Sequence, residues 1–400
     1  MLYNLQTRIM QLLAASLTIG GAVPAFGEDA PPSVVLSSRL TGDVNGVVRG
    51  AAGTGVRVLT NLDVVAVVDL GTLLAWRGAR VKLHVLDNRG GDPNGLAGTL
   101  QGVDNIEVGR NRTKLYQAWI EQDLFGGKAA LLLGLADLNA DFYQDDSAGV
   151  LLAPAFGIGS ELAATGPNGP SIFPSTALTA RLRVTLGAHG YVKGAVVDAK
   201  SGVLGDPGGV DWRMREGALL IGEAGWTGHG KVAVGYWRYT KRQEDIRLIG
   251  ANGLPAKAVS EGAYLLIDQP VTSSTARGPA ISLFARIGLS DGATTPFRGG
   301  WQFGTLVGKV FPSRPNSQFS IGINRGQLSE RYRANSADAQ FTLSHGETGV
   351  EATYSDQVTP YLRLQPDLQY VVHPSGNPAA RDAIIVGLRI VFIGSKMISR

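Results

Sequence analysis

Residues 361–372 read YLRLQPDLQYVV, and their side chains alternate between apolar and polar along most of the stretch. Successive side chains of a β-strand point to opposite faces, so this pattern predicts a strand with one apolar and one polar face. The apolar face carries Leu362, Leu364, Pro366, Leu368 and Tyr370, and the polar face carries Arg363, Gln365, Asp367 and Gln369. The fold depends on which solvent each face meets.

The same alternation recurs through the chain, whereas amphipathic helical periodicity is hard to find. In TALTARLRVTLG (176–187), Arg181 and Arg183 oppose Leu182, and in YQAWIEQD (116–123), Tyr116 falls opposite to Trp119. Many segments approach the roughly 9–11 residues that a tilted strand needs to cross a bilayer. About sixteen such segments lie between turns rich in Gly, Pro, Asn and Asp: 38–50, 55–70, 78–88, 113–125, 128–138, 176–187, 189–199, 216–227, 230–241, 262–270, 279–290, 299–310, 317–327, 347–358, 360–373 and 382–393.

Alternation alone does not identify the solvent, because soluble β-sandwiches also alternate. The connections are more informative. Those at 126–127 and 358–360 are very short, whereas 139–175, 200–215 and 242–261 are long, which is typical of outer-membrane barrels. Aromatic residues near strand ends suit an interfacial girdle, with core or edge packing as the alternative: Trp226, Trp237, Tyr239, Trp301, Phe303 and Tyr361. We therefore predict an all-β protein, a transmembrane antiparallel β-barrel of about sixteen strands in a Gram-negative outer membrane.

The composition agrees with this class. Glycine contributes 54 of 400 residues, about twice its usual share, and charged residues make up only 18%. A net charge of +4 without any basic run argues against nucleic-acid binding. The absence of cysteine excludes disulfide scaffolds and cysteine nucleophiles. Motifs of serine hydrolases, zinc proteases and phosphate-binding loops are also missing, so we expect neither an enzyme nor a cofactor.

The N-terminus has the order of a secretory signal peptide. One charge, Arg8, precedes an apolar stretch that ends in small residues, so residues 1–27 are predicted to be removed after Gly27. A retained membrane anchor is the alternative, but glycines and a proline interrupt the apolar core. A short segment, 28–37, would then lead into a barrel spanning 38–400, where no apolar run is long enough for a membrane-spanning helix.

Several segments resemble the carbohydrate-selective porins of the OprB family, in the same order and over nearly the whole mature chain. They are NRGGDPNGLAGTLQGVDNIEV (88–108), RTKLYQAWIEQDLFGGKAALLLGLADLNADF (112–142), APAFGIG (153–159), ELAATGPNGPSIFPSTALTARLRV (161–184), GALLIGEAGW (217–226), KVAVGYWRYT (231–240), FPSRPNSQFSIGINRGQLSERYR (311–333) and ETGVEATYSDQVTPYLRLQPDLQYVVHP (347–374).

The resemblance implies a sixteen-stranded barrel whose lumen, lined by arginines and acidic residues, is narrowed by inward-folded loops and admits small sugars. The extra N-terminal domain of some relatives is expected to be missing here. One departure concerns the end of the chain. Such barrels usually finish on an aromatic residue that the assembly machinery reads, but IGSKMISR follows Phe392. Either recognition by that machinery is impaired or Phe392 acts as an internal signal.

If the apolar faces meet lipid, the opposite faces line the lumen. Arg or Lys near the midplane of the lipid face costs about 2–4 kcal/mol, which favours this assignment. The alternative for any one charge is a place at the rim, in contact with water or lipopolysaccharide. The pore-lining candidates are Arg80, Lys82, His84, Trp119, Glu121, Asp123, Arg181, Arg183, Arg286, Arg363, Asp367 and Arg389.

The segment 139–175 is the expected constricting loop, since prolines and glycines let it hold one shape inside a wet lumen. Its acidic residues offer oxygen ligands for calcium as an alternative, but they lack the spacing of a calcium loop, and we predict no metal. The candidate residues of this loop are Asp141, Asp145, Asn168, Ser171 and Phe173.

The expected function is passive, selective diffusion of glucose and similar mono- or disaccharides. A general diffusion porin without sugar preference is the alternative, and a barrel enzyme or an adhesin is a more distant one. Arginine donors, carboxylate acceptors and aromatic faces suit a neutral, hydroxyl-rich solute. Expected partners are small sugars, outer-membrane lipid and lipopolysaccharide, and the barrel-assembly machinery, but no nucleic acid, with the protein a monomer or a homotrimer.

Overall fold

The computed structural model of this chain describes residues 33–272 and 278–398. Within these residues, sixteen strands close into one antiparallel barrel in the cyclic order β1-β18-β17-β16-β15-β14-β13-β12-β9-β8-β7-β6-β5-β4-β3-β2. The predicted fold class is confirmed. The barrel strands are β1 (Val34–Arg49), β2 (Gly55–Asp69), β3 (Ala79–Gly90), β4 (Arg112–Leu124), β5 (Ala129–Ala136), β6 (Ala177–Leu186), β7 (Gly190–Asp198), β8 (Ala218–Trp226), β9 (Lys231–Tyr239), β12 (Glu261–Pro270), β13 (Ala280–Ser290), β14 (Phe297–Gly308), β15 (Gln318–Leu328), β16 (Gly346–Thr359), β17 (Leu362–Val372) and β18 (Ala383–Ile398).

Each predicted segment corresponds to one barrel strand, and the main differences lie at the two ends of the chain. β1 begins at Val34, inside the segment 28–37 that we expected to precede the barrel. β18 continues past Phe392 to Ile398, which pairs with Val34. The tail is therefore an extension of the last strand, held by ladder hydrogen bonds to β1. The predicted signal peptide, residues 1–27, lies outside the described residues.

The elements outside the barrel wall are short. The hairpin of β10 (Gln243–Ile249) and β11 (Pro255–Ala258), which the sequence did not indicate, lies within the long connection predicted at 242–261. In residues 33–272 and 278–398, no helix has the length and apolar character needed to cross a membrane. The helices are α2 (Leu70–Leu74), α3 (Asn94–Ala97), α4 (Pro154–Gly157), α5 (Ser160–Ala163) and α6 (Glu330–Asp338), with 3₁₀ turns at Leu138–Ala140, Asp146–Ala148 and Pro374–Gly376.

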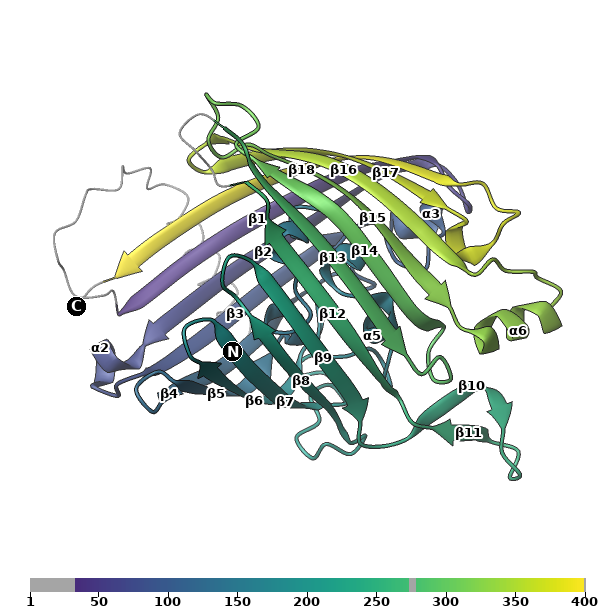
Figure 1. Ribbon diagram of the computed structural model, residues 1–400, viewed down its shortest axis with the longest axis horizontal. Coiled ribbons are helices and arrows are strands. Elements are labelled where there is room, and N and C mark those ends of the chain that lie inside the picture. Colours follow the sequence, from purple (N-terminus) through teal and green to yellow (C-terminus); the bar gives the residue numbers. More distant parts are fainter. Residues whose placement is uncertain (1–32, 273–277, 399–400) are drawn as a thin grey trace.

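The two ends of the barrel differ as the sequence predicted. One end carries the short connections and the free ends of β1 and β18, and the other carries β10, β11 and α6 (Figure 1). The short connections are 125–128, 187–189, 227–230 and 360–361. The long connections at the opposite end are 91–111, 137–176, 199–217, 240–260 and 329–345. In outer-membrane barrels the long loops are extracellular and the short turns periplasmic.

The two faces of the wall are those of a barrel in lipid. On β17, Leu368 points outward and is 51% exposed, whereas its neighbour Gln369 points inward and is 2% exposed. On β6, Leu182 is 45% exposed and Arg181 only 6%. Exposed apolar and buried polar side chains reverse the arrangement of a soluble protein. The apolar faces therefore meet hydrocarbon and the polar faces line the lumen.

Two of the aromatic residues expected in an interfacial girdle are not there. Trp226, Phe303 and Tyr361 lie on the surface, each more than 40% exposed. Trp237 and Tyr239, however, point into the barrel and are almost completely buried. Their prediction as girdle residues was wrong because the inside of this barrel contains apolar loop residues against which large aromatic side chains pack.

Candidate functional site

Two of the long connections fold into the barrel. Inner loop 1 (residues 91–111) joins β3 to β4 and includes α3, and inner loop 2 (residues 137–176) joins β5 to β6 and includes α4 and α5 (Figure 1). Inner loop 2 contains the segment 139–175 that the sequence indicated as a constriction. Its apolar side chains join wall residues of β7 to β12 in one buried cluster, which includes Phe142, Tyr143, Leu162, Leu219, Trp237 and Tyr264.

Carboxylates of the wall accept hydrogen bonds from the backbone of inner loop 2. Glu223 on β8 accepts from the Tyr143 N–H at 3.1 Å. Asp268 on β12 accepts from the Ser147 N–H at 2.7 Å and from its hydroxyl at 2.6 Å. Glu351 on β16 accepts from the N–H groups of Leu152 and Ala153, the latter at 2.9 Å. These contacts satisfy backbone donors that would otherwise be buried without a partner.

Cations and amides of the wall donate to the carbonyl groups of the same loop. Lys193 on β7 donates to the Asp141 carbonyl, and Lys231 on β9 donates to the Gln144 carbonyl at 2.5 Å. Arg286 on β13 donates to the Ala155 carbonyl at 2.5 Å, and Gln365 on β17 to the Val150 carbonyl at 2.6 Å. Inner loop 2 is thus held around much of the barrel by contacts to its backbone.

Glycines in the wall make room for this loop. A Cβ atom at Gly322 on β15 would lie 2.6 Å from the Phe156 ring and 2.8 Å from a Leu151 methyl group. A Cβ at Gly288 on β13 would overlap the carboxylate of Glu161. Both glycines face inward, so part of the high glycine content reflects close approach of a loop to the wall.

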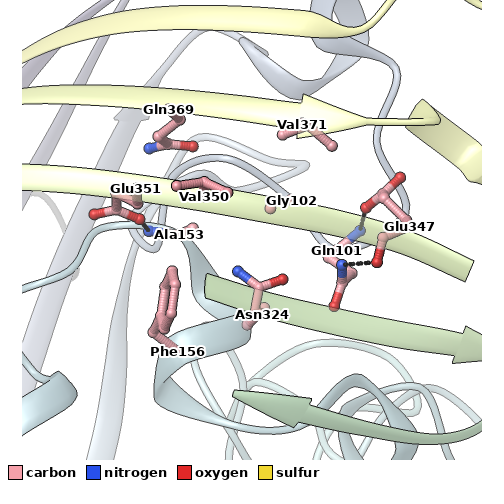
Figure 2. A pocket seen from close by; sticks show the side chains of 12 residues that line it. Gln101, Gly102, Ala153, Phe156, Asn324, Glu347, Val350, Glu351, Gln369 and Val371 are labelled. Atoms are coloured by element: carbon pink, nitrogen blue, oxygen red, sulfur yellow. Dashed lines mark hydrogen bonds between the residues drawn. The ribbon is translucent and has the colours of Figure 1, made fainter. Parts of the chain in front are cut away.

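Inner loop 1 lies on the neighbouring part of the wall. Glu347 on β16 accepts from the N–H groups of Leu100 and Gln101 at 2.8 and 3.0 Å. The two loops also meet, because the Asn105 N–H donates to the Leu152 carbonyl at 2.9 Å. Figure 2 shows a small cavity between both loops and strands β15 to β17. Its volume of about 10 Å³ is near the least space that one water molecule needs.

Arg389 anchors inner loop 1 to the wall from β18. It donates to both oxygens of Asp43 on β1, from Nε to Oδ1 at 2.8 Å and from Nη2 to Oδ2 at 2.6 Å, and to the Asn105 side chain at 2.7 Å. Its guanidinium also lies 3.5 Å from Asp104, and all three charged side chains are almost fully buried. The sequence did not indicate inner loop 1 as a constriction, although its length between two clear strands was a signal.

The structure places all twelve pore-lining candidates on the inner face and divides them into two groups. The inner loops or neighbouring side chains cover one group, whose members are buried: His84, Glu121, Arg181, Arg286, Asp367 and Arg389. The other group remains partly or largely exposed inside the barrel: Arg80, Lys82, Trp119, Asp123, Arg183 and Arg363. Arg286 and Arg389 bind the backbone or side chains of the inner loops, which cover them.

The five candidate residues of the constricting loop lie in different surroundings. Asp141 accepts from Arg181 at 3.1 Å at the edge of the open lumen, and Asp145 is buried against Gln302. The remaining three belong to the returning arm near the start of β6. Asn168 donates to the Ser201 carbonyl, Ser171 to the Ala136 carbonyl, and Phe173 packs edge-on to Tyr116. The acidic residues thus have separate partners, and no metal-binding cluster occurs in the described parts of the chain.

The open side of the lumen is bounded by β17, β1 to β4 and β6. Arg80 donates to Glu121 at 2.6 Å, and the Lys82 ammonium lies 5.8 Å from the centre of the Trp119 ring. Arg39 and Asp63 stand opposite each other in the β1–β2 register and also face inward. The sequence analysis did not name Arg39 and Asp63, although the alternation of side chains along residues 38–50 and 55–70 would have placed them on the inner face.

Two buried carboxyl groups of the inner loops have raised pKa values. Burial raises the pKa of Asp145 to about 7, although Arg286 and Gln302 favour its charged form. Burial and the charge of Asp43 raise the pKa of Asp104 to about 7, against the effect of Arg389. Both carboxyls lie where an inner loop meets the wall, so protonation affects how the loops are held.

We expect the folded state to lose stability as the pH rises from about 4 to about 7. A carboxyl with a raised pKa binds a proton on folding, so its contribution is complete below the ordinary value of 3.8 and is lost as the pH rises through about 7. Asp145→Asn should flatten part of this decline in the free energy of unfolding, measured with denaturant in detergent micelles. Asp146→Asn, on the exposed neighbour, is the control and should leave the slope unchanged. An equal slope in the parent and in Asp145→Asn would contradict the prediction.

An apolar outer face, long loops at one end and a polar lumen narrowed from inside together define a porin-like channel of an outer membrane. A family model described as "Carbohydrate-selective porin, OprB family" matches residues 54–392, and the chain belongs to this family. It is therefore a sugar-selective outer-membrane channel of a Gram-negative bacterium, and its family is one of channels rather than enzymes.

Individual relatives are similar in sequence or in fold. Porin B of Pseudomonas aeruginosa is 24% identical over 365 residues, which cover 81% of this chain and 79% of that protein. The high-pH structure of Pseudomonas putida OprB has a TM-score of 0.80 at 22% identity and covers 90% of this chain and 94% of its own. The outer-membrane channel DcaP of Acinetobacter baumannii has a TM-score of 0.54 at 10% identity, covering 94% of this chain and 100% of its own.

Proposed function

We propose that glucose and similar mono- or disaccharides cross the barrel along the open side of the lumen. The path runs between inner loop 2, at Asp141, and the part of the wall formed by β17, β1 to β4 and β6. The side chains that contact the sugar are the six exposed candidates together with the two residues opposite each other on β1 and β2: Arg39, Asp63, Arg80, Lys82, Trp119, Asp123, Arg183 and Arg363.

The observation that carries this proposal is the pairing of Lys82 with Trp119 in the open lumen, where the carboxylates of Asp141 and Asp63 act electrostatically on Lys82. An indole ring offers a flat apolar face to a pyranose, while the Lys82 ammonium and the nearby carboxylate of Asp63 exchange hydrogen bonds with its hydroxyls. Arg183, whose guanidinium lies 5.6 Å from the Tyr191 ring, provides a second donor with an aromatic neighbour. Several modest sites of this kind replace water around the sugar yet allow its release.

We expect Trp119→Ala and Arg183→Ala each to reduce the block of single-channel current by added glucose, because each removes one contact of the path. The apparent affinity should fall about tenfold in Trp119→Ala, as when an aromatic contact of about 1.4 kcal/mol is lost. Trp212→Ala and Arg213→Ala, both on the extracellular loop 199–217, are matched controls. If glucose blocks both variants as strongly as the parent, these residues do not line the path.

Uptake by liposomes tests the sugar preference itself. Liposomes that contain the protein should admit monosaccharides faster than amino acids of similar size. Equal rates would favour general diffusion without sugar preference. This experiment uses only the parent protein, so its outcome does not depend on whether a variant folds.

We further propose that residues 1–27 direct export and that the assembly machinery reads Phe392 as an internal signal. Phe392 faces outward on β18 and is 45% exposed, so the extension to Ile398 does not cover it. The barrel then functions within outer-membrane lipid, as a monomer or as a homotrimer.

A further inference from the structure

Three charged clusters occupy the outer face of the barrel at its extracellular end. On β3, Arg89 donates to Asp87 through Nε and Nη2, both at 2.8 Å, and Thr113 on β4 donates to the same carboxylate. These side chains face outward, because their neighbours Leu86 and Asn88 on β3 are buried inside the barrel. The Arg89 side chain is 59% exposed.

The second cluster lies on β9 and β12. Arg238 and Tyr236 both contact the carboxylate of Glu261, Arg238 at 3.6 Å and Tyr236 through a hydrogen bond. They also face outward, since Trp237 between them is buried within the barrel. Half of the Arg238 side chain is exposed.

The third cluster lies where β1, β17 and β18 end. Arg49 donates through Nε to the Asp382 carbonyl at 2.7 Å, and its guanidinium lies 5.9 Å from the Tyr370 ring. Tyr370 donates to the Asp382 carboxylate and shares the outer face with Leu368. A bulge after Val47 turns Arg49 to the outer face, where it pairs with Ile384.

We propose that these three clusters, called the rim arginine sites, bind the phosphorylated headgroups of lipopolysaccharide. This proposal depends on the outer-membrane location of the protein and not on the proposed sugar path. Each lies at the lipid-facing end of strands next to the extracellular loops, where the outer leaflet has its headgroups. A guanidinium has five N–H donors, and the contacts described above engage one or two in each arginine, so donors remain for a phosphate.

The composition of the sites supports this ligand. An arginine suits the planar, bidentate recognition of a phosphate. The carboxylate beside each arginine provides oxygen ligands for a divalent cation that bridges to a second phosphate. Tyr236 and Tyr370 place an apolar ring toward the acyl chains and a hydroxyl toward the headgroup, as at other membrane interfaces.

The test compares the parent with the triple variant Arg49→Gln/Arg89→Gln/Arg238→Gln in detergent micelles. The probe is bisphosphorylated lipid A, and the readout is its dissociation constant from native mass spectrometry or thermal shift. We expect the triple variant to bind at least tenfold more weakly and each single variant to show part of that loss. Lys396→Gln, on the outer face at the periplasmic end, is the matched control and should bind as the parent does.

Two results would overturn the proposal. One is equal affinity of the parent and the triple variant for lipid A. The other is binding of phosphatidylglycerol as tight as that of lipid A, which would assign the sites to any anionic headgroup. Single-channel conductance and glucose block should stay unchanged in the triple variant, because none of the three arginines faces the lumen. This readout also verifies that the variant is folded.

Discussion

Replacing Glu351 by alanine is expected to raise the single-channel conductance several-fold and to weaken the discrimination between sugars and other small solutes. The carboxylate of Glu351 accepts two backbone N–H groups of inner loop 2, at Leu152 and Ala153, and is only 1% exposed. Its removal leaves two buried donors without a partner, at roughly 1–3 kcal/mol each. We therefore expect inner loop 2 to detach from β16 at this point. The barrel itself stays closed, because hydrogen bonds between its strands hold the wall.

Planar-bilayer recordings of current and glucose block measure this effect. Glu351→Gln keeps one acceptor oxygen and should lie between the parent and Glu351→Ala. Asp356→Asn is the control, because it removes the same charge from the same strand. Asp356 contacts Arg314 and not the loop, so this variant should conduct like the parent. A conductance that does not change in Glu351→Ala would show that this contact does not hold inner loop 2 in the lumen.

Replacing Arg389 by methionine is expected to destabilise the protein by about 3–5 kcal/mol, the usual effect of removing one partner from a buried ion pair. The guanidinium lies between Asp43 and Asp104, at 2.6 and 3.5 Å, and both carboxylates are 1% exposed. Without it, two acidic groups face each other in a site that excludes water. Denaturant unfolding in micelles gives the free energy of unfolding of the parent and the variant.

Arg363→Met is the matched control for this experiment. Arg363 also points inward, from the adjacent strand β17, but it binds the Ser355 hydroxyl and the Gln318 side chain instead of buried carboxylates. Its replacement should cost less than 1 kcal/mol, as for most partly exposed polar groups. Adding Asp43→Asn and Asp104→Asn to Arg389→Met should restore part of the loss, because the unpaired charges disappear. Similar losses for Arg363→Met and Arg389→Met would contradict the assigned role.

The barrel could be predicted because the side-chain pattern that specifies each strand lies within the sequence of that strand. Each strand must present apolar side chains to lipid on one face, so YLRLQPDLQYVV and the other segments carry a period of two that survives without knowledge of their neighbours. The same periodicity placed all twelve wall candidates on the inner face. It failed at Tyr116, which was expected on the apolar face, because a bulge opposite His84 and Val85 turns this residue inward.

The roles of the inner residues could not be predicted in this way. Arg183 and Arg286 look alike in the sequence, since both lie at polar positions of alternating strands. Only the path of inner loop 2 separates them, because it covers Arg286 with the Ala155 carbonyl and leaves Arg183 exposed. Contacts between residues this far apart in the chain have no local periodicity.

The sequence by itself determined the barrel, its sixteen strands, the end that carries the long loops and the family. The barrel, its strands and its two ends follow from side-chain alternation and turn residues, which act within a few positions along the chain. The family follows from the segments that resemble it. The tertiary structure alone decided that the tail after Phe392 completes the last strand, that a second loop enters the lumen, and which charges hold loops instead of facing the sugar path. These depend on which distant groups satisfy buried backbone donors and acceptors, and that is settled only when the barrel closes around its loops.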